Sequence, residues 1–362
     1  MRWGDVKSIL CVRLDNMGDV LMTTPAFRAL KESFPGVRLT LLTSHMGAGT
    51  ARFIPEIDAV ITFDVPWVKL DGDGADEGAI LALVERLKAE PFDAAILFTV
   101  FSQNPLPAAL ILYMAGIPLR LGYCRENPYG LLTDWLPDHE PFAGIAHEVE
   151  RQLSLVGQVG ARTDNARLSL RVPVGAGEAA IGAAGIDPAM PWLVLHPGVS
   201  EQRRQYPPEG YVEAGRTLRQ RGMQIVITGS ASERALAERI ASETGGVSLA
   251  GKLDLDGLIG LIDRAPLLIS NNTGPVHIAA AVQTPVIVLY AHTNPQHTPW
   301  MTPNRVLYFD VPPERRSKNV LLDYTYRATV SQPVRDAQPR EIVDAALELL
   351  QEGTHADYQP GI

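Results

Sequence analysis

The chain has 362 residues, of which 32 are Lys or Arg and 41 are Asp or Glu, and its formal net charge is −9. Hydrophobic residues make up 46% and charged residues 20%, the ordinary balance of a soluble globular protein. Because no basic stripe or tail is present to attract phosphates, we expect no nucleic-acid partner. A chain of this length usually exceeds one hydrophobic core, so we expect two domains.

The cysteines and the apolar segments bear on location. Cys11 and Cys124 are far apart and belong to no Cys/His cluster, which favours buried free thiols in a reducing compartment. No hydrophobic segment of signal-peptide length precedes Ile9, so we expect a cytoplasmic protein. The longest apolar stretch, residues 106–119, is too short to span a bilayer. We expect a buried helix there, with a membrane-surface contact as the alternative.

In the first half of the chain, apolar runs of strand length alternate with longer amphipathic stretches. This pattern is typical of βαβ units and a parallel sheet. The expected strands are residues 8–12, 38–42, 59–63, 94–98 and 119–122. The expected helices are residues 20–34, 79–90 and 107–115. We assign residues 1–172 to this domain.

Residues 173–191 are rich in Gly, Ala and Pro, and we expect a linker region with a short helix there. The alternation then restarts, so the fold class is α/β with two doubly wound domains. The expected strands are residues 192–196, 224–228, 246–249, 267–270 and 286–290, and the expected helices are 211–221, 231–243, 255–264 and 276–282. We assign residues 192–335 to the second domain, expect 292–338 to be irregular, and expect a C-terminal helix and tail in 336–362.

Two glycine patterns resemble phosphate-binding motifs without their context. Residues 175–180 fit GxGxxA, but the next strand does not end on the acidic residue that a dinucleotide site requires. Residues 246–252 fit GxxxxGK, but Leu253 replaces the hydroxyl residue and the middle is strand-like. We expect no metal site, because the histidines lack zinc spacing and no paired acids follow a strand.

The first strand is followed by a polar loop, Arg13-Leu14-Asp15-Asn16-Met17-Gly18-Asp19. Ligands of open α/β sheets collect at such strand-to-helix loops, and Gly18 allows a close backbone approach. Asp19 lies where the helix begins. One interpretation is that it only caps the helix. The other is that it is a general base for an acceptor hydroxyl.

Three loops of the second half have comparable features. After residue 196, Gly198 and Ser200 offer donors, and Arg203 and Arg204 carry guanidinium groups suited to a diphosphate, with solvated surface arginines as the alternative. A second loop carries Ser230 and Glu233, which could form a capping box or contact a ribose.

The third loop is Asn271-Asn272-Thr273-Gly274-Pro275, which leads into a helix carrying His277. The first amides of such a helix bind anions, so Thr273 and Gly274 are candidates for diphosphate contacts. His277 is equally well explained as a core histidine or as a site residue.

These loops together resemble glycosyltransferase family 9, the family of the ADP-heptose:lipopolysaccharide heptosyltransferases. The matching segments are residues 13–25 (RLDNMGDVLMTTP), 196–207 (HPGVSEQRRQYP), 249–252 (LAGK), 270–280 (SNNTGPVHIAA) and 290–299 (YAHTNPQHTP). Their order and spacing cover nearly the whole chain. The resemblance implies a GT-B architecture, in which two Rossmann-like domains face each other across a cleft. It places the acceptor on the N-terminal domain and the nucleotide sugar on the C-terminal domain.

The resemblance also implies roles for single residues. Asp19 matches the family's proposed catalytic base, and Arg204 takes the place of its phosphate-binding lysine. Asn272 stands where the family has an acidic residue, which is a departure from its pattern. The expected diphosphate contacts are Gly198, Ser200, Arg203, Arg204, Thr273 and Gly274. The expected nucleoside or sugar contacts are Ser230, Glu233, Asn272 and His277, and the acceptor-side loop contributes Arg13, Asn16 and Gly18.

The function that follows from the resemblance is inverting, metal-independent transfer of a sugar, with heptose favoured, from a nucleoside diphosphate to a cell-envelope glycan such as lipopolysaccharide core. We expect ADP-heptose as co-substrate, no cofactor, and a glycan or glycolipid acceptor, with a peripheral contact at the inner face of the inner membrane. Lys69, Arg120 and Arg125 are candidates for an anionic acceptor surface. The alternatives are a nucleotide-sugar epimerase or hydrolase on the same fold, and a catalytically silent sugar-nucleotide-binding protein.

Overall fold

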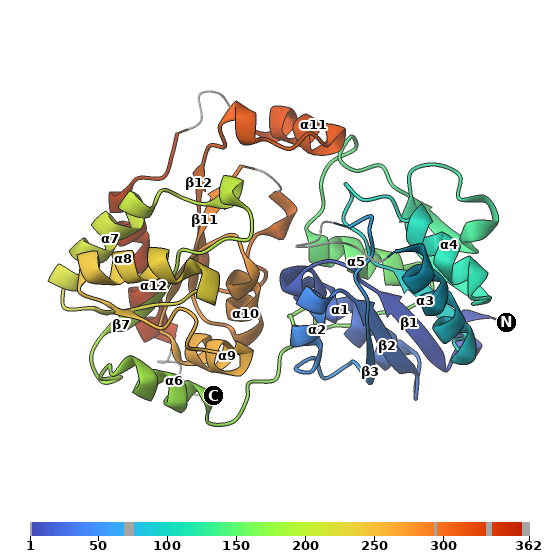
Figure 1. Cartoon of the computed structure of the whole chain (residues 1–362), viewed down its shortest axis with the longest axis horizontal. Helices are drawn as coiled ribbons and strands as arrows, with labels where there is room; N and C mark the ends of the chain where they lie inside the picture. Colours follow the sequence, from blue (N-terminus) through green and yellow to red (C-terminus); the bar gives the residue numbers. More distant parts are fainter. Residues whose placement is uncertain (1, 69–75, 293–294, 331–334, 357–362) are drawn as a thin grey trace. The chain divides into compact units, whose positions relative to one another are not determined.

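The computed structural model describes residues 2–68, 76–292, 295–330 and 335–356. The chain divides into two compact units, Met1–Arg171 and Val172–Ile362, hereafter the first and the second unit. Each unit contains one six-stranded sheet with helices packed on it (Figure 1). All pairings between neighbouring strands are parallel. The expected fold class, two consecutive doubly wound α/β domains, is confirmed.

The sheet of the first unit has the strand order β3-β2-β1-β4-β5-β6. Its strands are β1 Ser8–Val12, β2 Arg38–Thr43, β3 Ala59–Thr62, β4 Ala94–Leu97, β5 Leu119–Cys124 and β6 Asp134–Pro137. Its helices are α1 Met17–Ser33, α2 His45–Ala51, α3 Glu77–Ala89, α4 Leu106–Met114 and α5 Glu148–Gly157, with short 3₁₀ turns η1 Trp3–Asp5 and η2 Tyr129–Leu131. The five strands expected from the sequence are present, whereas α2, β6 and α5 were not anticipated.

Burial on both faces explains the near-continuous apolar strands of the first unit. On β1, Ile9 and Cys11 pack in one core with α1 and α5, and Leu10 and Val12 pack in another with α3 and α4. Cys11 and Cys124 are both buried free thiols, as expected. Burial raises the pKa of the Cys11 thiol, so it is unreactive at neutral pH.

The sheet of the second unit has the order β12-β11-β10-β7-β8-β9, the same topology as the first. Its strands are β7 Trp192–His196, β8 Gln224–Ile227, β9 Val247–Ser248, β10 Leu268–Asn271, β11 Val286–Ala291 and β12 Asn304–Phe309. Its helices are α6 Ala176–Ala184, α7 Pro208–Gln220, α8 Arg234–Thr244, α9 Leu255–Arg264, α10 Gly274–Val282, α11 Val320–Thr329 and α12 Pro339–Ala356, with 3₁₀ turns η3 Gln202–Arg204, η4 Ala231–Glu233, η5 Pro295–His297 and η6 Pro313–Arg315.

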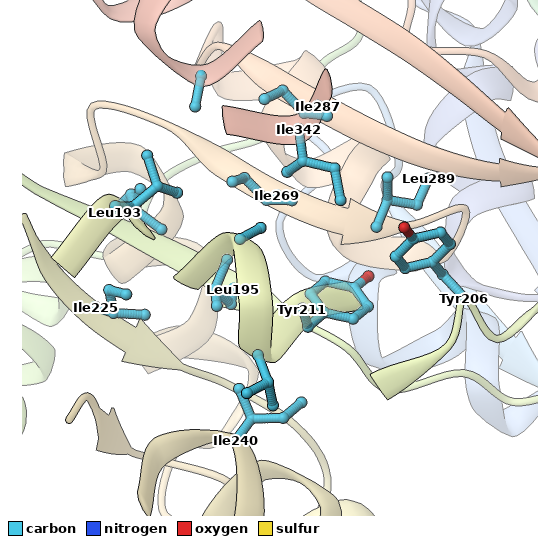
Figure 2. Packing of buried hydrophobic residues seen from close by; sticks show 14 of the residues in the cluster. Leu193, Leu195, Tyr206, Tyr211, Ile225, Ile240, Ile269, Ile287, Leu289 and Ile342 are labelled. Atoms are coloured by element: carbon cyan, nitrogen blue, oxygen red, sulfur yellow. The ribbon is translucent and has the colours of Figure 1, made fainter. Parts of the chain in front are cut away.

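One expectation for the second unit was wrong. Residues 292–338 were expected to be irregular, but they contain β12, which pairs with β11 from Val286↔Asn304 to Ala291↔Phe309, and the helix α11. β12 is an edge strand of mixed polarity, and its apolar signal is therefore weak. The helix α12 contributes Ile342 to the same core as Leu193 and Ile287, so it is an integral part of this unit (Figure 2).

Glycines explain the packing of α6, the short helix expected in residues 173–191. A Cβ atom on Gly177 would lie 2.8 Å from the Gly260 carbonyl oxygen of α9, and a Cβ atom on Gly260 would lie 2.4 Å from the Gly177 nitrogen. The two helices therefore approach each other through their backbones. The GxGxxA pattern of residues 175–180 is therefore explained by the close packing of α6 on α9 at Gly177.

Candidate functional site

Each sheet has a point at which the order of its strands reverses, and ligands of open α/β sheets bind outside the carboxyl ends of the strands there. This point lies between β1 and β4 in the first unit and between β7 and β10 in the second. The loops after β1 and β7 begin at Arg13 and Pro197. Two of the four loops singled out from the sequence therefore leave their sheets at the positions that most often bind ligands.

Arg13 is the centre of a buried charge cluster in the first unit. Its side chain is 0% exposed; Nη1 donates to Glu148 Oε1 at 2.8 Å, and Nη2 donates to Asp19 Oδ1 at 3.1 Å. Its Nε lies 3.1 Å from Asp15 Oδ2, close enough for an ion pair but without hydrogen-bond geometry. Burial alone would lower the pKa of Arg13, but the carboxylates of Glu148, Asp15 and Asp19 raise it. The guanidinium is therefore permanently charged.

Asp15 gives this cluster its unusual charge balance. Its side chain is almost fully buried, Oδ1 accepts a hydrogen bond from Gln103 Nε2, and its backbone oxygen accepts one from Ser44 Oγ at 2.7 Å. Burial, opposed by Arg13, raises the pKa of Asp15 to about 6. Three carboxylates surround one guanidinium, and burial disfavours the excess negative charge. Asp15 therefore holds a proton in mildly acidic solution.

Asp19 both caps α1 and belongs to the charge cluster around Arg13. Its Oδ2 accepts a hydrogen bond from the Asn16 amide at 3.3 Å, which closes the first turn of α1. Its side chain is 16% exposed, in contrast to Arg13 and Glu148 at 0%. Gly18 precedes it and is buried. Asp19 therefore does cap α1, and its role as a general base stays a prediction.

In the second unit, the loops after β7 and β8 meet through Glu233. The Glu233 carboxylate fills the space above Gly198, where a Cβ atom would lie 2.2 Å from Glu233 Cδ. Its Oε2 accepts hydrogen bonds from the Ser230 amide at 2.7 Å and from Ser230 Oγ at 2.9 Å. Beneath them, a ring nitrogen of His196 lies 2.9 Å from Thr228 Oγ1. Gly198, Ser230 and Glu233 therefore share one site, whereas Ser200 is exposed on the same loop.

Asn271 joins the loop after β7 to the end of β10, a role that the sequence did not reveal. Its side chain is fully buried, Nδ2 donates to the Pro197 carbonyl at 2.8 Å, and Oδ1 accepts from the Tyr206 amide at 3.0 Å. Two residues later Thr273 is the N-cap of α10, whose first residues are Gly274 and Pro275. The first amides of α10 therefore lie beside a loop that Asn271 holds in place, an arrangement suited to an anion.

Asn272 and the two arginines each have a partner within the second unit. Asn272 is 5% exposed, and its side chain is hydrogen-bonded to Tyr290. Tyr290 lies near Arg204, and burial raises the pKa of its hydroxyl group. Glu201 Oε2 lies 2.5 Å from Arg203 Nε and 3.6 Å from Arg204 Nε. The Glu201 carboxylate of the same loop thus balances part of the positive charge of the two arginines. His277 is also buried, inside α10.

Two of the three basic residues named from the sequence for an acceptor surface donate hydrogen bonds to the backbone. Arg120 donates to the backbone oxygens of Leu131 at 2.7 Å and Gly130 at 2.8 Å, and it is 8% exposed, so it holds the β5–β6 connection and offers no acceptor surface. Arg125 donates to the Phe101 oxygen. Lys69, like residues 293–294 of the last motif, lies outside the described residues.

The apolar stretch of residues 106–119 forms α4 and the start of β5. Ala109 and Leu112 of α4 are buried, whereas Leu110 and Tyr113 are about half exposed, at 47% and 55%. Within the described parts of the chain, no helix has the length and hydropathy needed to cross a membrane. Among the same residues, no group of three or more His, Cys, Asp or Glu side chains is arranged to hold a metal ion.

The chain is similar in sequence to proteins named lipopolysaccharide heptosyltransferases. The chain is 26% identical over 307 residues to lipopolysaccharide heptosyltransferase 2 of Escherichia coli K12, covering 80% of this chain and 84% of that protein. It is 28% identical over 296 residues to lipopolysaccharide heptosyltransferase 3 of the same strain, covering 78% and 81%. It is 25% identical over 296 residues to lipopolysaccharide heptosyltransferase 1 of Pseudomonas aeruginosa, covering 80% of each.

Solved structures share the fold. A family 9 glycosyl transferase of Veillonella parvula superposes with a TM-score of 0.76 at 18% identity, covering 96% of this chain and 98% of that one. The E. coli ADP-heptose lps heptosyltransferase II superposes with a TM-score of 0.73 at 23% identity, covering 96% and 99%. The sequence profile described as glycosyltransferase family 9 (heptosyltransferase) matches residues 80–324. The chain belongs to glycosyltransferase family 9, and the protein is a glycosyltransferase.

Proposed function

We propose that this glycosyltransferase moves a heptose from ADP-heptose to a lipopolysaccharide core glycan, with inversion at the anomeric carbon and without a metal ion. The curated relatives named as lipopolysaccharide heptosyltransferases support the substrate class. The E. coli ADP-heptose lps heptosyltransferase II, which has a similar fold, supports the donor. With this acceptor, we propose that the enzyme works at the cytoplasmic face of the inner membrane as a peripheral protein.

The observation that carries the proposal is the Asp19 carboxylate, partly exposed and held by Arg13. In the proposed reaction, the acceptor hydroxyl oxygen attacks the anomeric carbon, and its proton moves to the Asp19 carboxylate. The bond from the anomeric carbon to the diphosphate oxygen breaks, and ADP leaves with the electron pair. A general base of this kind contributes about 10²–10⁴-fold to a rate. Arg13 orients the carboxylate for this step through the hydrogen bond from its Nη2.

The second unit supplies the groups proposed to hold the donor. Gly198, Thr273 and Gly274 offer backbone or hydroxyl donors to the diphosphate, and Arg203 and Arg204 offer positive charge. Glu233, together with Ser230, offers an acceptor to a ribose hydroxyl. Asn272 and His277 are proposed to lie against the nucleoside or the sugar. Donors placed in advance where charge develops stabilise a leaving diphosphate without reorganisation, and in this proposal they replace a metal ion.

A donor screen and a transfer assay test this function. Each of ADP-, UDP-, GDP- and dTDP-sugars is added in a thermal-shift measurement, since a bound nucleotide raises the melting temperature by mass action. We expect ADP-heptose to give the largest shift, and the absence of any shift would contradict the proposal. Transfer to a heptose-terminated core oligosaccharide should persist in EDTA, and NMR should show inverted anomeric configuration in the product.

The same assay distinguishes the two alternatives. A hydrolase or epimerase would turn ADP-heptose over without an acceptor at the same rate as with one. A silent binding protein would show the thermal shift and no turnover. We expect only slow hydrolysis until the oligosaccharide is added.

A further inference from the structure

A polar pocket of about 390 Å³ opens in the first unit at the carboxyl ends of β5 and β6. It is lined by Tyr123 of β5, by Asp138, His139 and Glu140 after β6, by the loop of residues 143–146, and by Arg151 of α5. Its size falls within the range of small-molecule sites. It lies on the same side of the sheet as the switch point between β1 and β4, because the carboxyl ends of parallel strands share one edge. No residue of this pocket was singled out from the sequence.

Arg151 makes the inner wall of the pocket rigid. Its side chain is 1% exposed, and Nη1 and Nη2 each donate to an Asp138 oxygen at 3.1 Å. Nε donates to the Thr99 carbonyl at 2.9 Å, and Cζ lies 4.1 Å above the centre of the Tyr123 ring. A bidentate guanidinium–carboxylate pair that also stacks on an aromatic ring has one geometry. The wall is therefore formed before any ligand arrives.

The charges of the pocket favour a ligand that donates hydrogen bonds. Glu140 Oε2 lies 3.4 Å from Arg151 Nη1 and makes no hydrogen bond, while Oε1 accepts a long one of 3.4 Å from the Ala146 amide. Burial raises the pKa of Glu140, and the Arg151 guanidinium and the Ala146 amide offset this only in part. The Asp138 carboxylate is shared between Arg151 and Arg125, whose Nη2 lies 3.3 Å away. An anionic ligand would meet carboxylates here, whereas hydroxyl groups would find acceptors.

The helix α5 connects this pocket to the charge cluster around Asp19. Glu148, the first residue of α5, forms the ion pair with Arg13, and Arg151 lies three residues further along the same helix. A ligand in the pocket thus lies against the helix that also holds Arg13 and, through it, Asp19. Both sites belong to the first unit.

We propose that the β6–α5 pocket binds an uncharged, hydroxyl-rich sugar residue of the acceptor glycan, with Glu140 as its main hydrogen-bond acceptor. This inference rests on the proposed function, since it assigns the acceptor of the same reaction. The pocket selects against a phosphorylated or carboxylated sugar at this position, because the ligand's charge would be repelled by Glu140. Glu140 binds the acceptor and takes no part in the chemical step.

Two variants with a matched control test the proposal. Glu140→Gln keeps the shape and removes the charge, and Ala143→Trp fills the pocket from a position that is exposed. Glu126→Gln removes an exposed carboxylate after β5 that does not line the pocket. A thermal shift with ADP reports that each variant is folded and binds nucleotide. Transfer kinetics use ADP-heptose and a phosphate-free, heptose-terminated oligosaccharide.

We expect Glu140→Gln and Ala143→Trp to raise the acceptor KM roughly tenfold or more, the effect of losing a hydrogen bond to a charged group. The donor KM should stay unchanged, and Glu126→Gln should match the wild type. An unchanged acceptor KM in both pocket variants would overturn the proposal. So would a lower KM for the same oligosaccharide carrying a phosphate on its terminal sugar.

A binding measurement separates this inference from the function on which it rests. Saturation-transfer NMR with methyl mannopyranoside and its phosphate monoester needs no turnover. If the wild type transfers no heptose to any acceptor, the proposed function has failed. Saturation of methyl mannopyranoside by the wild type but not by Ala143→Trp would then still support the pocket. Equal saturation in both, none in either, or a preference for the phosphate monoester would overturn it.

Discussion

The loops after β1 and β7 leave their sheets at equivalent positions but are held in place differently. Buried ion pairs hold the first, and neutral hydrogen bonds to the backbone hold the second. The loop after β1 gathers Arg13, Asp15, Asp19 and, from α5, Glu148 into one cluster whose side chains are between 0% and 16% exposed. The loop after β7 instead makes its contacts through its backbone. Gly198 packs against Glu233, and the Pro197 carbonyl accepts a hydrogen bond from Asn271 of β10. Buried, paired charges suit a proton transfer, whereas backbone amides suit the binding of an anion.

The difference also concerns stability. A buried ion pair is costly to break because the charge that remains has lost its partner. A loop held by neutral hydrogen bonds loses less when one of them is removed. Substitutions in the loop of the first unit should therefore lower the free energy of unfolding most. Substitutions in the loop of the second unit should mainly lower the affinity for the ligand.

Removing the cation of the first loop should have the largest effect on stability. Arg13→Met leaves Glu148 buried without its ion pair, so we expect a loss of about 3–5 kcal/mol in the free energy of unfolding. Hydrogen exchange should show the loss in α1 and α5 of the first unit and not in α10 of the second. Arg38→Met, at an exposed position of β2, is the matched control and should change stability little. Equal effects of the two substitutions would contradict the charge cluster.

Removing the polar clamp of the second loop should cost less. Asn271→Ala leaves the Pro197 carbonyl and the Tyr206 amide without this partner, which we expect to lower the free energy of unfolding by about 2–4 kcal/mol. The freed loop should also bind ADP more weakly in calorimetry. If the variant keeps wild-type affinity for ADP, Asn271 does not position the loop for the nucleotide.

The pH dependence of stability should identify Asp15. Its folded-state pKa of about 6 is above the ordinary value, so the folded protein binds this proton more tightly than the unfolded chain does. The stabilisation is therefore present below about pH 4 and is lost as the pH rises through about 6. Denaturant unfolding should show a fall of up to about 3 kcal/mol in wild-type stability relative to Asp15→Asn across this window. Parallel pH profiles for the two proteins would show that Asp15 is not the group responsible.

A methyl group at Gly198 should have the smallest effect on folding and a visible one on binding. The new Cβ atom would overlap Glu233, whose side chain would have to move away from Ser230. We expect Gly198→Ala to weaken ADP binding roughly tenfold, as for one charge-assisted hydrogen bond. Glu233→Gln should weaken it similarly, and the double variant should be no weaker than Gly198→Ala alone. Additive losses would mean that Glu233 and Gly198 act independently.

The sequence predicts the sheets better than the parts that complete the sites. Buried parallel strands such as β1 and β7 are predicted by continuous apolar runs in the sequence. The helix α5 has no such signal, because Glu148, Arg151 and Gln152 are polar side chains buried against partners far away in the chain. β12 and β6 are edge strands, whose mixed polarity is typical of loops as well.

The same limit applies to single residues of the candidate site. Asp19, Gly198 and Thr273 could be named because each follows a strand and is close to the start of a helix or 3₁₀ turn. Glu148, Gln103 and Tyr290 could not, since their relevance depends on contacts with Arg13, Asp15 and Asn272 that only the folded chain creates. Long-range polar contacts leave no periodic pattern in a sequence.

The central claim is that Asp19 is the general base, and Asp19→Asn tests it most directly. Asparagine keeps the size of the side chain and an oxygen for the cap of α1 but cannot accept the proton. The measurement is kcat for heptose transfer under saturating donor and acceptor, with calorimetry to confirm unchanged ADP-heptose binding and Asp5→Asn, an exposed acid of the same unit, as control. We predict a fall in kcat of roughly 10²–10⁴-fold. A fall of less than about tenfold with donor binding intact would contradict the assignment.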